Sequence, residues 1–297
     1  MLKIILNSQS RAGSAIKYWQ RLRENWSVGH YEIYEHENFN EIPIAFGDKL
    51  VAAGGDGTLN QLINNVIARV GLENVSGFTF GHIGLGSNNS YLKPFSGCQI
   101  IGGSPVKLSS ENESHDLGRV IYRDLSGSLQ TRYFIANASF GVLAHANQIF
   151  SNDRMIRFFK KVSIKVADAL SFLKALKNFS APEIYFSTDG VFRELTCITN
   201  LNVIKHPYFA GDFHVCEKPE LSDGMFHYYV LPKKSKLDIL RAFVKMSLGQ
   251  DVMGKGIPTD SIIVKCQKPI CFEFDGEVVE GTEFHLSCLQ GAIRVCQ

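Results

Sequence analysis

The amino-acid sequence predicts two domains, a parallel α/β domain followed by an antiparallel β-sandwich domain. Strand-like and helix-like segments alternate up to about residue 118, and short β-type runs separated by turn residues follow them. With 297 residues, of which 45% are hydrophobic, the chain can bury one large core or two ordinary ones. We therefore expect a first domain over residues 1–118 and a second over residues 119–287, and residues 288–297 can return to the first.

The first domain opens with an apolar strand at residues 3–6, a polar loop at 7–13 and a helix to about residue 25. A buried strand at 49–53 ends in glycines, and a further strand at 77–83 ends in a second glycine loop. Between these strands, one helix face carries apolar residues at the i, i+3, i+4, i+7, i+8 spacing, namely Leu59, Leu62, Ile63, Val66 and Ile67. Strands that feed helices through short loops predict a Rossmann-like parallel sheet with ligands at the carboxyl ends of its strands.

The second domain is predicted from β-type runs at residues 131–137, 184–188, 191–199, 226–231, 262–265 and 271–274. Turn signals such as Asp189-Gly190 divide them. Two helical segments, 154–178 and 236–247, interrupt the runs, and a final strand pair at about 284–295 could close either domain. The pattern predicts an antiparallel architecture.

Composition excludes several classes of protein. A formal net charge of +2 argues against nucleic acid as a partner. Seven cysteines without a Cys-x-x-Cys pair indicate reduced thiols in a cytoplasm, and the nine histidines lack metal-ligand spacing. The sequence contains no run of about 18 apolar residues, so it predicts no membrane span. The sequence leaves the oligomeric state open, a homodimer included.

The strongest chemical signal is Gly54-Gly55-Asp56-Gly57-Thr58, which lies between a predicted strand and a predicted helix. Glycines admit a phosphate close to the backbone, and the helix N-terminus attracts an anion. The motif lacks the Gly-Lys-Ser/Thr ending of a Walker A loop, and its aspartate would repel a phosphate unless a cation such as Mg²⁺ lay between them. The alternative is a tight turn with an aspartate at a helix N-terminus.

The segment from Gly54 to Asn60 resembles the nucleotide-binding signature of diacylglycerol, sphingosine and ceramide kinases and their bacterial relatives. The Gly-Gly-Asp-Gly core also occurs in NAD kinases and phosphofructokinases, but the Thr-Leu-Asn continuation favours lipid kinases. Gln61 stands where the family usually has an acidic residue. The resemblance implies an NAD kinase/diacylglycerol kinase-like fold that binds ATP.

Two further loops extend the resemblance. Residues 7–13 resemble the family's N-terminal phosphate loop, although its proline is missing; Asn7, Ser10 and Arg11 would contact phosphate, and without the resemblance this is an ordinary turn. Residues 84–93 resemble the family's second glycine loop, and they place a serine, Ser90, at its aspartate position. The residues that fall on the loop's glycine, hydroxyl, asparagine and basic positions are Gly86, Ser87, Asn89 and Lys93.

In the second domain, the resemblance implies a structural metal bound by the Asp223 side chain and the carbonyls of Glu220 and Met225. Asp223-Gly224 is equally a common turn. Taken without the resemblance, residues 272–278 predict a hairpin turn. The resemblance implies that Asp275 is the base that accepts the proton of the substrate's hydroxyl group, and that Glu277 lies beside the nucleotide.

Residues 115–118 resemble a family strand whose aspartate, here Asp116, faces the nucleotide. Asp56, Asp116 and Asp275 are then expected in one cleft. The predicted helix over residues 154–177 is basic and amphipathic. It can lie on anionic lipid headgroups at a membrane periphery, or be a surface helix whose apolar side packs in the core.

Five segments in the family's order predict an ATP- and Mg²⁺-dependent lipid kinase. Asp275 and Asp56 are its candidate catalytic residues, and Gly54, Gly55, Gly57, Thr58 and Gly86 would hold phosphates. The acceptor would be a hydroxyl of a lipid such as diacylglycerol or a sphingoid base. The alternatives are an NAD-kinase-like enzyme, which lacks support because the expected Thr-Pro-Thr-Gly-Ser segment is missing, and a catalytically weakened lipid- or nucleotide-binding protein, which Gln61 and Ser90 favour.

Overall fold

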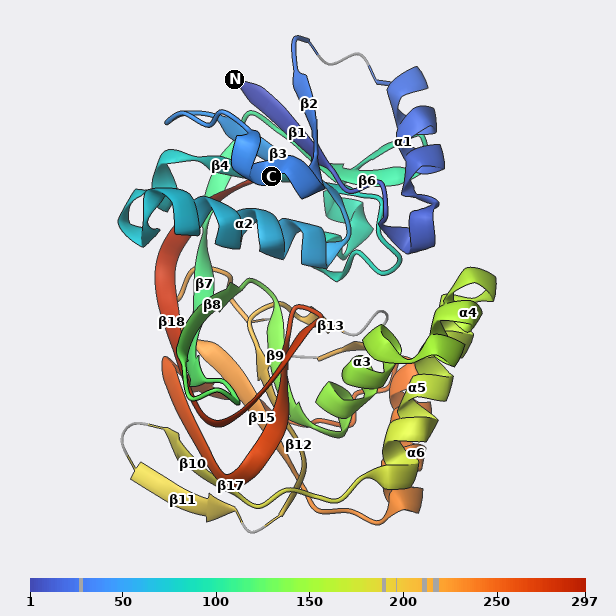
Figure 1. The fold of residues 1–297 in the computed structure, drawn as a ribbon, viewed down its shortest axis with the longest axis vertical. Helices are drawn as coiled ribbons and strands as arrows, with labels where there is room; N and C mark the ends of the chain where they lie inside the picture. The colour runs from blue at the N-terminus through green and yellow to red at the C-terminus, as the bar shows by residue number, and fades with distance from the viewer. Residues whose placement is uncertain (27–28, 189–190, 196, 210–212, 216–218) are drawn as a thin grey trace. The chain divides into compact units, whose positions relative to one another are not determined.

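The computed structural model describes the chain apart from residues 27–28, 189–190, 196, 210–212 and 216–218. Contacts divide it into two compact units (Figure 1). The first comprises Met1–Leu117, Leu221–Asp223 and Gln290–Gln297, and the second comprises Gly118–Glu220 and Gly224–Leu289. The turn expected at Asp189-Gly190 lies outside the described residues.

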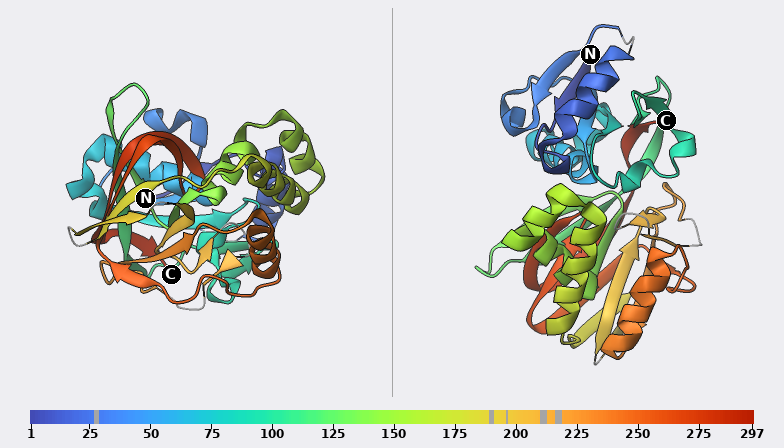
Figure 2. Two further views of the ribbon diagram at one scale, coloured as in Figure 1. Left: turned by 90° about the horizontal axis from the view of Figure 1, so that it is seen from below. Right: turned by 90° about the vertical axis from the view of Figure 1, so that its right-hand side faces the viewer.

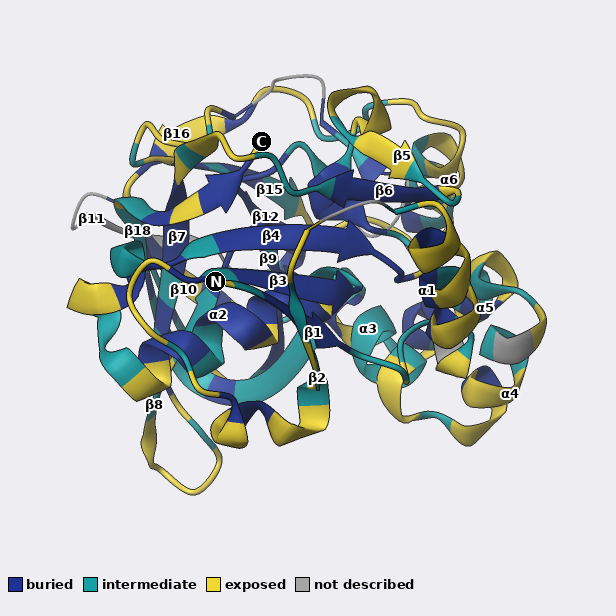
Figure 3. Cartoon of the chain, turned by 90° about the horizontal axis from the view of Figure 1, so that it is seen from above, coloured by how far each residue is buried: buried dark blue, intermediate teal, exposed yellow. Residues whose placement is uncertain are grey.

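A parallel sheet forms the centre of the first unit. Its strands are β1 (Leu2–Leu6), β2 (Glu32–Glu35), β3 (Lys49–Gly54) and β4 (Thr79–Gly84). β1 pairs in parallel with β2 and β3, and β3 pairs in parallel with β4. The last five residues of β3 and of β4 are all buried, as Figure 3 shows by their dark blue colour. Such continuous burial is typical of parallel strands that are covered on both faces.

Helices and short elements complete the first unit. The helices are α1 (Ala15–Glu24) and α2 (Asp56–Val70). The five apolar residues predicted on one face of α2 are all buried, which confirms that prediction. β5 (Gln99–Ile101) and β6 (Ser104–Lys107) form an antiparallel pair beside β4. The 3₁₀ helices are η1 (Arg11–Gly13), η2 (His36–Glu41), η3 (Leu72–Gly77), η4 (Ser90–Leu92) and η5 (Phe95–Gly97).

Two long strands, β7 (Asn112–Arg123) and β18 (Glu277–Cys296), contribute residues to both units. The final strand pair expected at residues 284–295 is wrong, because β18 is one continuous strand of 20 residues. It pairs antiparallel with β17 (Ser261–Phe274), and near its end Arg294 and Val295 pair in parallel with β4. The chain end is therefore part of the first unit.

Besides β7, β17 and β18, the strands of the second unit are β8 (Leu129–Phe134), β9 (Asn137–Gly141), β10 (Ile184–Thr188), β11 (Val191–Leu195), β12 (Ile198–Ile204), β13 (Tyr208–Phe209), β14 (Phe213–His214), β15 (Phe226–Pro232) and β16 (Ile257–Thr259). The unit is antiparallel, with neighbouring strands in the order β16-β15-β12-β9-β17-β18. Aromatic rings fill the core: Phe140 stacks on Phe272 with centroids 4.4 Å apart, and Phe284 lies 5.2 Å and 5.0 Å from these two rings. Such pairs stabilise a core beyond the area they bury. The unit has the predicted sandwich class.

The described part of the second unit contains four helices, and Figure 2 shows them from two sides: α3 (Val142–Asn152), α4 (Arg154–Val162), α5 (Ile164–Asn178) and α6 (Lys236–Ser247). The single helix expected over 154–178 is wrong, because Ser163 is extended (φ −158°) and begins a new helix. α3 was not expected, whereas α6 matches its prediction. No helix among the described residues is both long and apolar enough to cross a membrane.

Candidate active site

The first glycine loop connects β3 to α2 in the first unit. β3 ends at Gly54, Gly55 occupies the N-cap position, and α2 begins at Asp56. A Cβ atom added to Gly54 would lie 2.3 Å from Thr58 Oγ1, so only glycine fits there. The first N–H groups of a helix have no partner within it, which makes this turn suited to binding an anion.

The second glycine loop, which follows β4, is hydrogen-bonded directly to the first. The Gly54 carbonyl accepts the N–H groups of Leu85 (2.9 Å) and Gly86 (3.0 Å). The Asp56 carboxylate accepts the N–H groups of Ser90 (2.7 Å) and Tyr91 (3.1 Å). The two loops therefore form one rigid structure at the carboxyl ends of adjacent parallel strands.

Close backbone contact supports this junction. A Cβ atom added to Gly86 would lie 2.3 Å from Gly55 Cα. Asn89 adopts the left-handed conformation (φ 47°) and holds the loop closed, because its Oδ1 accepts the Gly86 N–H (3.0 Å) and its Nδ2 donates to the Gly86 carbonyl (3.2 Å). Asn89 is buried, whereas Gly57 and Ser87 are exposed. Among the predicted phosphate-binding residues, the exposed ones can contact a ligand and Asn89 shapes the loop.

The N-terminal loop joins the same structure through Thr58. Asn7 Nδ2 donates to Thr58 Oγ1 (3.1 Å), and the Ser10 hydroxyl lies 3.4 Å from that atom. The Arg11 guanidinium lies over the ring of Tyr18, 4.2 Å from its centroid. The N-terminal loop thus meets the first glycine loop at a buried threonine, and the phosphate contact of Arg11 stays a prediction.

His82 supports the junction and was missed in the sequence. It is fully buried in β4, and its Nε2 lies 3.3 Å from the Gly54 carbonyl. Burial lowers the pKa of His82, and the nearby Asp56 carboxylate opposes this only in part. The ring is therefore neutral at physiological pH. The only feature of the sequence that could have indicated this role is a histidine at an inward position of an otherwise apolar strand.

Asp116 lies on β7, where it is buried. Its Oδ1 accepts the Gly291 N–H (2.8 Å), and its own N–H donates to the Leu221 carbonyl (2.7 Å). The preceding residue, His115, bonds through Nδ1 to the Tyr91 hydroxyl, and burial lowers its pKa. This pair links β7 to the second glycine loop.

Asp275 occupies the turn between β17 and β18 in the second unit, with the left-handed conformation (φ 46°). It is buried, and its carboxylate accepts three consecutive backbone N–H groups: those of Ile135 (2.6 Å), Ala136 (3.0 Å) and Asn137 (3.1 Å). These bonds fix the carboxylate in one orientation. Glu277, two residues on, forms an ion pair with Arg132 at 3.8 Å, and burial raises its pKa although Arg132 opposes the shift.

Glu273 is a second acidic group beside this turn that the sequence analysis missed. Its carboxylate accepts the Gly276 N–H (2.8 Å) and the Ser139 hydroxyl (2.9 Å). Burial, with a smaller contribution from the Asp275 charge, raises the pKa of Glu273 to about 7. The feature of the sequence that could have indicated this buried acidic group is an acidic residue between two apolar residues of a strand.

Asp56 and Asp116 lie in the first unit and Asp275 lies in the second. Their expected meeting in one cleft stays a prediction. The donor set at Asp56 suits Mg²⁺, because its two oxygens each accept one N–H and a carboxylate offers about four acceptor positions. Mg²⁺ is commonly bound by one or two carboxylates together with substrate phosphates and water.

The residues expected to bind a structural metal show a different arrangement. Glu220 and Asp223 are exposed, and the Met225 carbonyl accepts a hydrogen bond from Lys205 Nζ at 2.8 Å. Within the described ranges, no group of three or more His, Cys, Asp and Glu side chains could hold a metal ion. A site built from one carboxylate and two backbone carbonyls is not such a group of side chains, so the structural metal stays a prediction.

Comparison with known proteins identifies two family domains in the chain. Residues 1–120 match the diacylglycerol kinase catalytic domain, and residues 136–297 match the YegS C-terminal NAD kinase beta sandwich-like domain. The chain is 22% identical over 253 residues to the Bacillus subtilis protein named "Putative lipid kinase YtlR", covering 83% of this chain and 79% of that one. It is 24% identical over 252 residues to the Yersinia pestis protein named "Probable lipid kinase YegS-like", covering 82% and 77%.

The fold also matches a solved structure titled "A putative diacylglycerol kinase from Bacillus anthracis str. Sterne". The TM-score is 0.68 at 16% identity, and the match covers 99% of this chain and 96% of the other. This likeness concerns the fold alone. With both family domains present in order, the chain belongs to the family that joins a diacylglycerol kinase catalytic domain to a YegS-type C-terminal β-sandwich domain.

Proposed function

We propose that this protein is an ATP-dependent lipid kinase that transfers the γ-phosphate of ATP to a hydroxyl group of a lipid. The observation that carries the proposal is the hydrogen-bonded junction of the two glycine loops through Asp56, Ser90 and Tyr91. It places two glycine turns and a helix N-terminus at one edge of a parallel sheet, which is where nucleotide phosphates bind in α/β folds. Relatives named as lipid kinases support the acceptor class.

Each residue has a definite task in the proposed reaction. The backbone N–H groups at Gly55 and Gly57 bind phosphate oxygens, and the exposed Ser87 hydroxyl can donate to them as well. Mg²⁺, bound at Asp56, would supply positive charge against the phosphates. Asp116, which the resemblance places beside the nucleotide, is held on β7 by its bond to the Gly291 N–H.

The chemical step needs a base near the lipid hydroxyl. Asp275 accepts the hydroxyl proton while the lipid oxygen forms a bond to the γ-phosphorus, and the bond to the β,γ-bridging oxygen breaks to release ADP. The three N–H groups at residues 135–137 hold the Asp275 carboxylate in place, so little reorientation is required during the reaction. Candidate acceptors are diacylglycerol, a sphingoid base and other lipid alcohols.

Two alternatives make different predictions. An NAD-kinase-like enzyme would phosphorylate NAD, and a catalytically weakened protein would bind nucleotide or lipid without turnover. Ser90, in place of the family's aspartate, and Gln61 favour the weakened protein, but the Asp56–Ser90 bond uses only the backbone of residue 90. Thermal shift with Mg²⁺ and ATP, followed by radiolabel assays with lipids and with NAD, separates the three.

We also propose that α4 contacts the surface of an anionic membrane. Met155, Phe158 and Val162 follow the i, i+3, i+7 spacing of one helix face, and they are 52%, 65% and 72% exposed. Arg154 and Arg157 are exposed on the same helix. Apolar side chains flanked by basic ones are typical of a helix that lies in the headgroup region of a bilayer. The exposure of these side chains favours this interpretation over a helix whose apolar side is entirely in the core.

A further inference from the structure

Lys205 is a buried lysine in the second unit that plays no part in the proposed reaction. It follows β12 directly, and its side chain is 1% exposed. Its Nζ donates a 2.8 Å hydrogen bond to the carbonyl of Met225, the residue before β15. Burying an ammonium group costs several kcal/mol unless oxygen acceptors compensate it. A lysine in this position therefore requires a structural reason.

The acceptor of this bond is one of the oxygens that the sequence assigned to a structural metal ion. Ammonium groups and hard divalent cations favour the same carbonyl and carboxylate oxygens. Two cations that share one carbonyl repel each other. The Met225 carbonyl can bind one of the two cations well, and in the structure it accepts the hydrogen bond of Lys205 Nζ.

The loop offers a divalent ion few protein ligands, and one of them is already occupied by Lys205. Ca²⁺ takes about six to eight oxygen ligands and Mg²⁺ about six, of which Mg²⁺ usually keeps several as water. The predicted set offers one carboxylate and two carbonyls, and both acidic residues of the loop, Glu220 and Asp223, are exposed. An ammonium needs only three acceptors.

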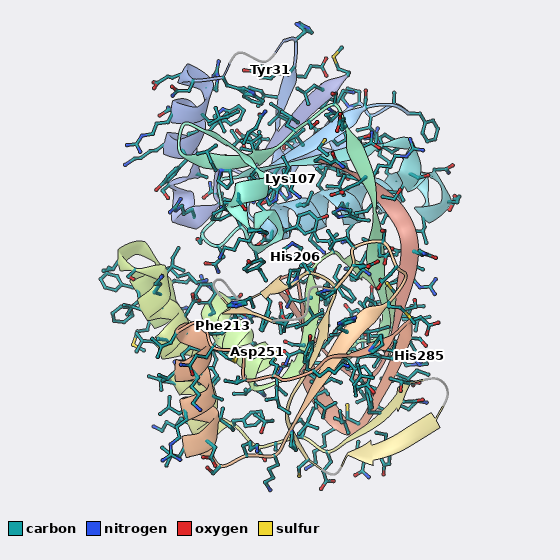
Figure 4. All side chains as sticks on the ribbon, turned by 180° about the vertical axis from the view of Figure 1, so that it is seen from behind. Tyr31, Lys107, His206, Phe213, Asp251 and His285 are labelled. Atoms are coloured by element: carbon teal, nitrogen blue, oxygen red, sulfur yellow. The ribbon has the colours of Figure 1, made fainter. Side chains whose placement is uncertain are left out.

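The position of Lys205 explains what a cation does here. The backbone N–H groups of Lys205 and His206 both donate to the Ala136 carbonyl, at 2.8 Å and 3.0 Å; His206 is labelled in Figure 4. The Ala136 N–H donates in turn to Asp275 Oδ1. The residue that binds Met225 through its side chain thus also binds, through its backbone N–H, the segment that holds the Asp275 turn. A cation at this point fastens the start of β15 to the same segment.

We propose that the Lys205 ammonium is a built-in replacement for the structural metal, so that the loop over residues 220–225 needs no divalent ion. The inference is independent of the lipid kinase activity, because it concerns only the bond between Lys205 and the Met225 carbonyl and the loop that contains Met225.

Metal content and thermal stability of the wild-type protein decide the matter. Purified protein without nucleotide should contain no stoichiometric divalent metal, and EDTA should leave its melting temperature unchanged. One equivalent of bound metal that Asp223→Ala lacks, or a melting temperature that EDTA lowers in the wild type but not in Asp223→Ala, would overturn the proposal.

A matched pair of variants tests Lys205 itself. Lys205→Met keeps the length of the side chain and removes the ammonium, whereas Lys268→Met makes the same change at an exposed site on β17. Lys205→Met should lower the melting temperature by about 4 °C or more relative to Lys268→Met, since a buried acceptor loses its donor. Equal melting temperatures in the two variants would contradict the proposal. If Lys205→Met does not fold, the wild-type measurement still decides, and neither readout uses kinase activity.

Discussion

The Asp56 carboxylate accepts the backbone N–H of Ser90 at 2.7 Å, and this bond joins the two glycine loops. Asp56 therefore has two tasks: it fixes the loop geometry, and it is the carboxylate placed to bind Mg²⁺. Asp56→Ala should abolish detectable magnesium-ATP binding in calorimetry and lower the melting temperature. Ala68→Ser, an exposed change on the same helix, is the control. Normal magnesium-ATP binding by Asp56→Ala would contradict the assigned role.

Ser90→Asp tests the departure from the family pattern. Because the Ser90 N–H contacts Asp56, an aspartate at position 90 brings a second carboxylate near the first. We expect the magnesium concentration for half-maximal ATP binding to fall, and the metal-free protein to become less stable through repulsion between the carboxylates. A higher magnesium requirement would show that other carboxylates already balance the cation. No change in either direction would place Ser90 outside the nucleotide site.

Asp275→Asn should lower turnover by about 10²-fold or more while ATP affinity changes by no more than a few-fold, because a lost base affects the chemical step. It should also cost about 1–3 kcal/mol of stability, since the amide N–H₂ would face backbone N–H donors.

The control for this variant is Asp124→Asn. Asp124 also accepts backbone N–H groups, from Ser126 (2.9 Å) and Ser128 (3.0 Å), but in an exposed turn of the same unit. It should retain wild-type turnover. An unchanged rate for Asp275→Asn in an established assay would remove Asp275 from the active site.

The raised pKa of Glu273 predicts a pH dependence of stability. Its pKa is about 7 in the folded protein against an ordinary 4.5, so the folded state binds the proton more tightly. The stability from this group is fully present below about pH 4.5 and lost as the pH rises to about 7, on the order of 3 kcal/mol. Glu273→Gln should show a smaller loss of unfolding free energy between pH 5 and pH 8 in urea titrations. The control Glu24→Gln, at an exposed residue, should show the same pH dependence of stability as the wild type. If Glu273→Gln also shows that dependence, Glu273 does not titrate in this range.

The proposed membrane contact predicts that Phe158→Ser weakens binding to vesicles of anionic phospholipid. The benzyl group is exposed on α4, and its loss removes apolar area that would enter the bilayer. Leu125→Ser, at an equally exposed apolar residue in a turn, is the control and should bind like the wild type. Equal vesicle binding by both variants in a sedimentation assay would exclude α4 as the contact.

The sequence predicted the parallel sheet, helix α2 and the glycine loops because their signals are local. The apolar spacing of α2 is visible among neighbouring residues, and Gly54 is required by Thr58, four residues further along the chain. Helix α3 was missed because its first turn depends on a distant residue: the Leu143 N–H donates to Asn200 Oδ1 at 3.0 Å. A pattern among neighbouring residues in the sequence cannot indicate such a cap.

The candidate site shows the same limit. The motif residues could be named from the sequence, but their partners could not: Asp275 binds N–H groups nearly 140 residues away, and His82 acquires its lowered pKa only through burial. The break at Ser163 was predictable in principle, since a serine whose side chain accepts the N–H of Val166 is a common helix N-cap. The continuous basic and apolar pattern on both sides obscured it.

The most direct test of the kinase assignment is an assay of the purified protein with radiolabelled ATP, Mg²⁺ and a total lipid extract, with NAD in a parallel reaction. We predict a labelled lipid that requires the wild-type protein and decreases about 10²-fold with Asp275→Asn. Labelled NADP, or ATP binding without any labelled lipid, would contradict the assignment.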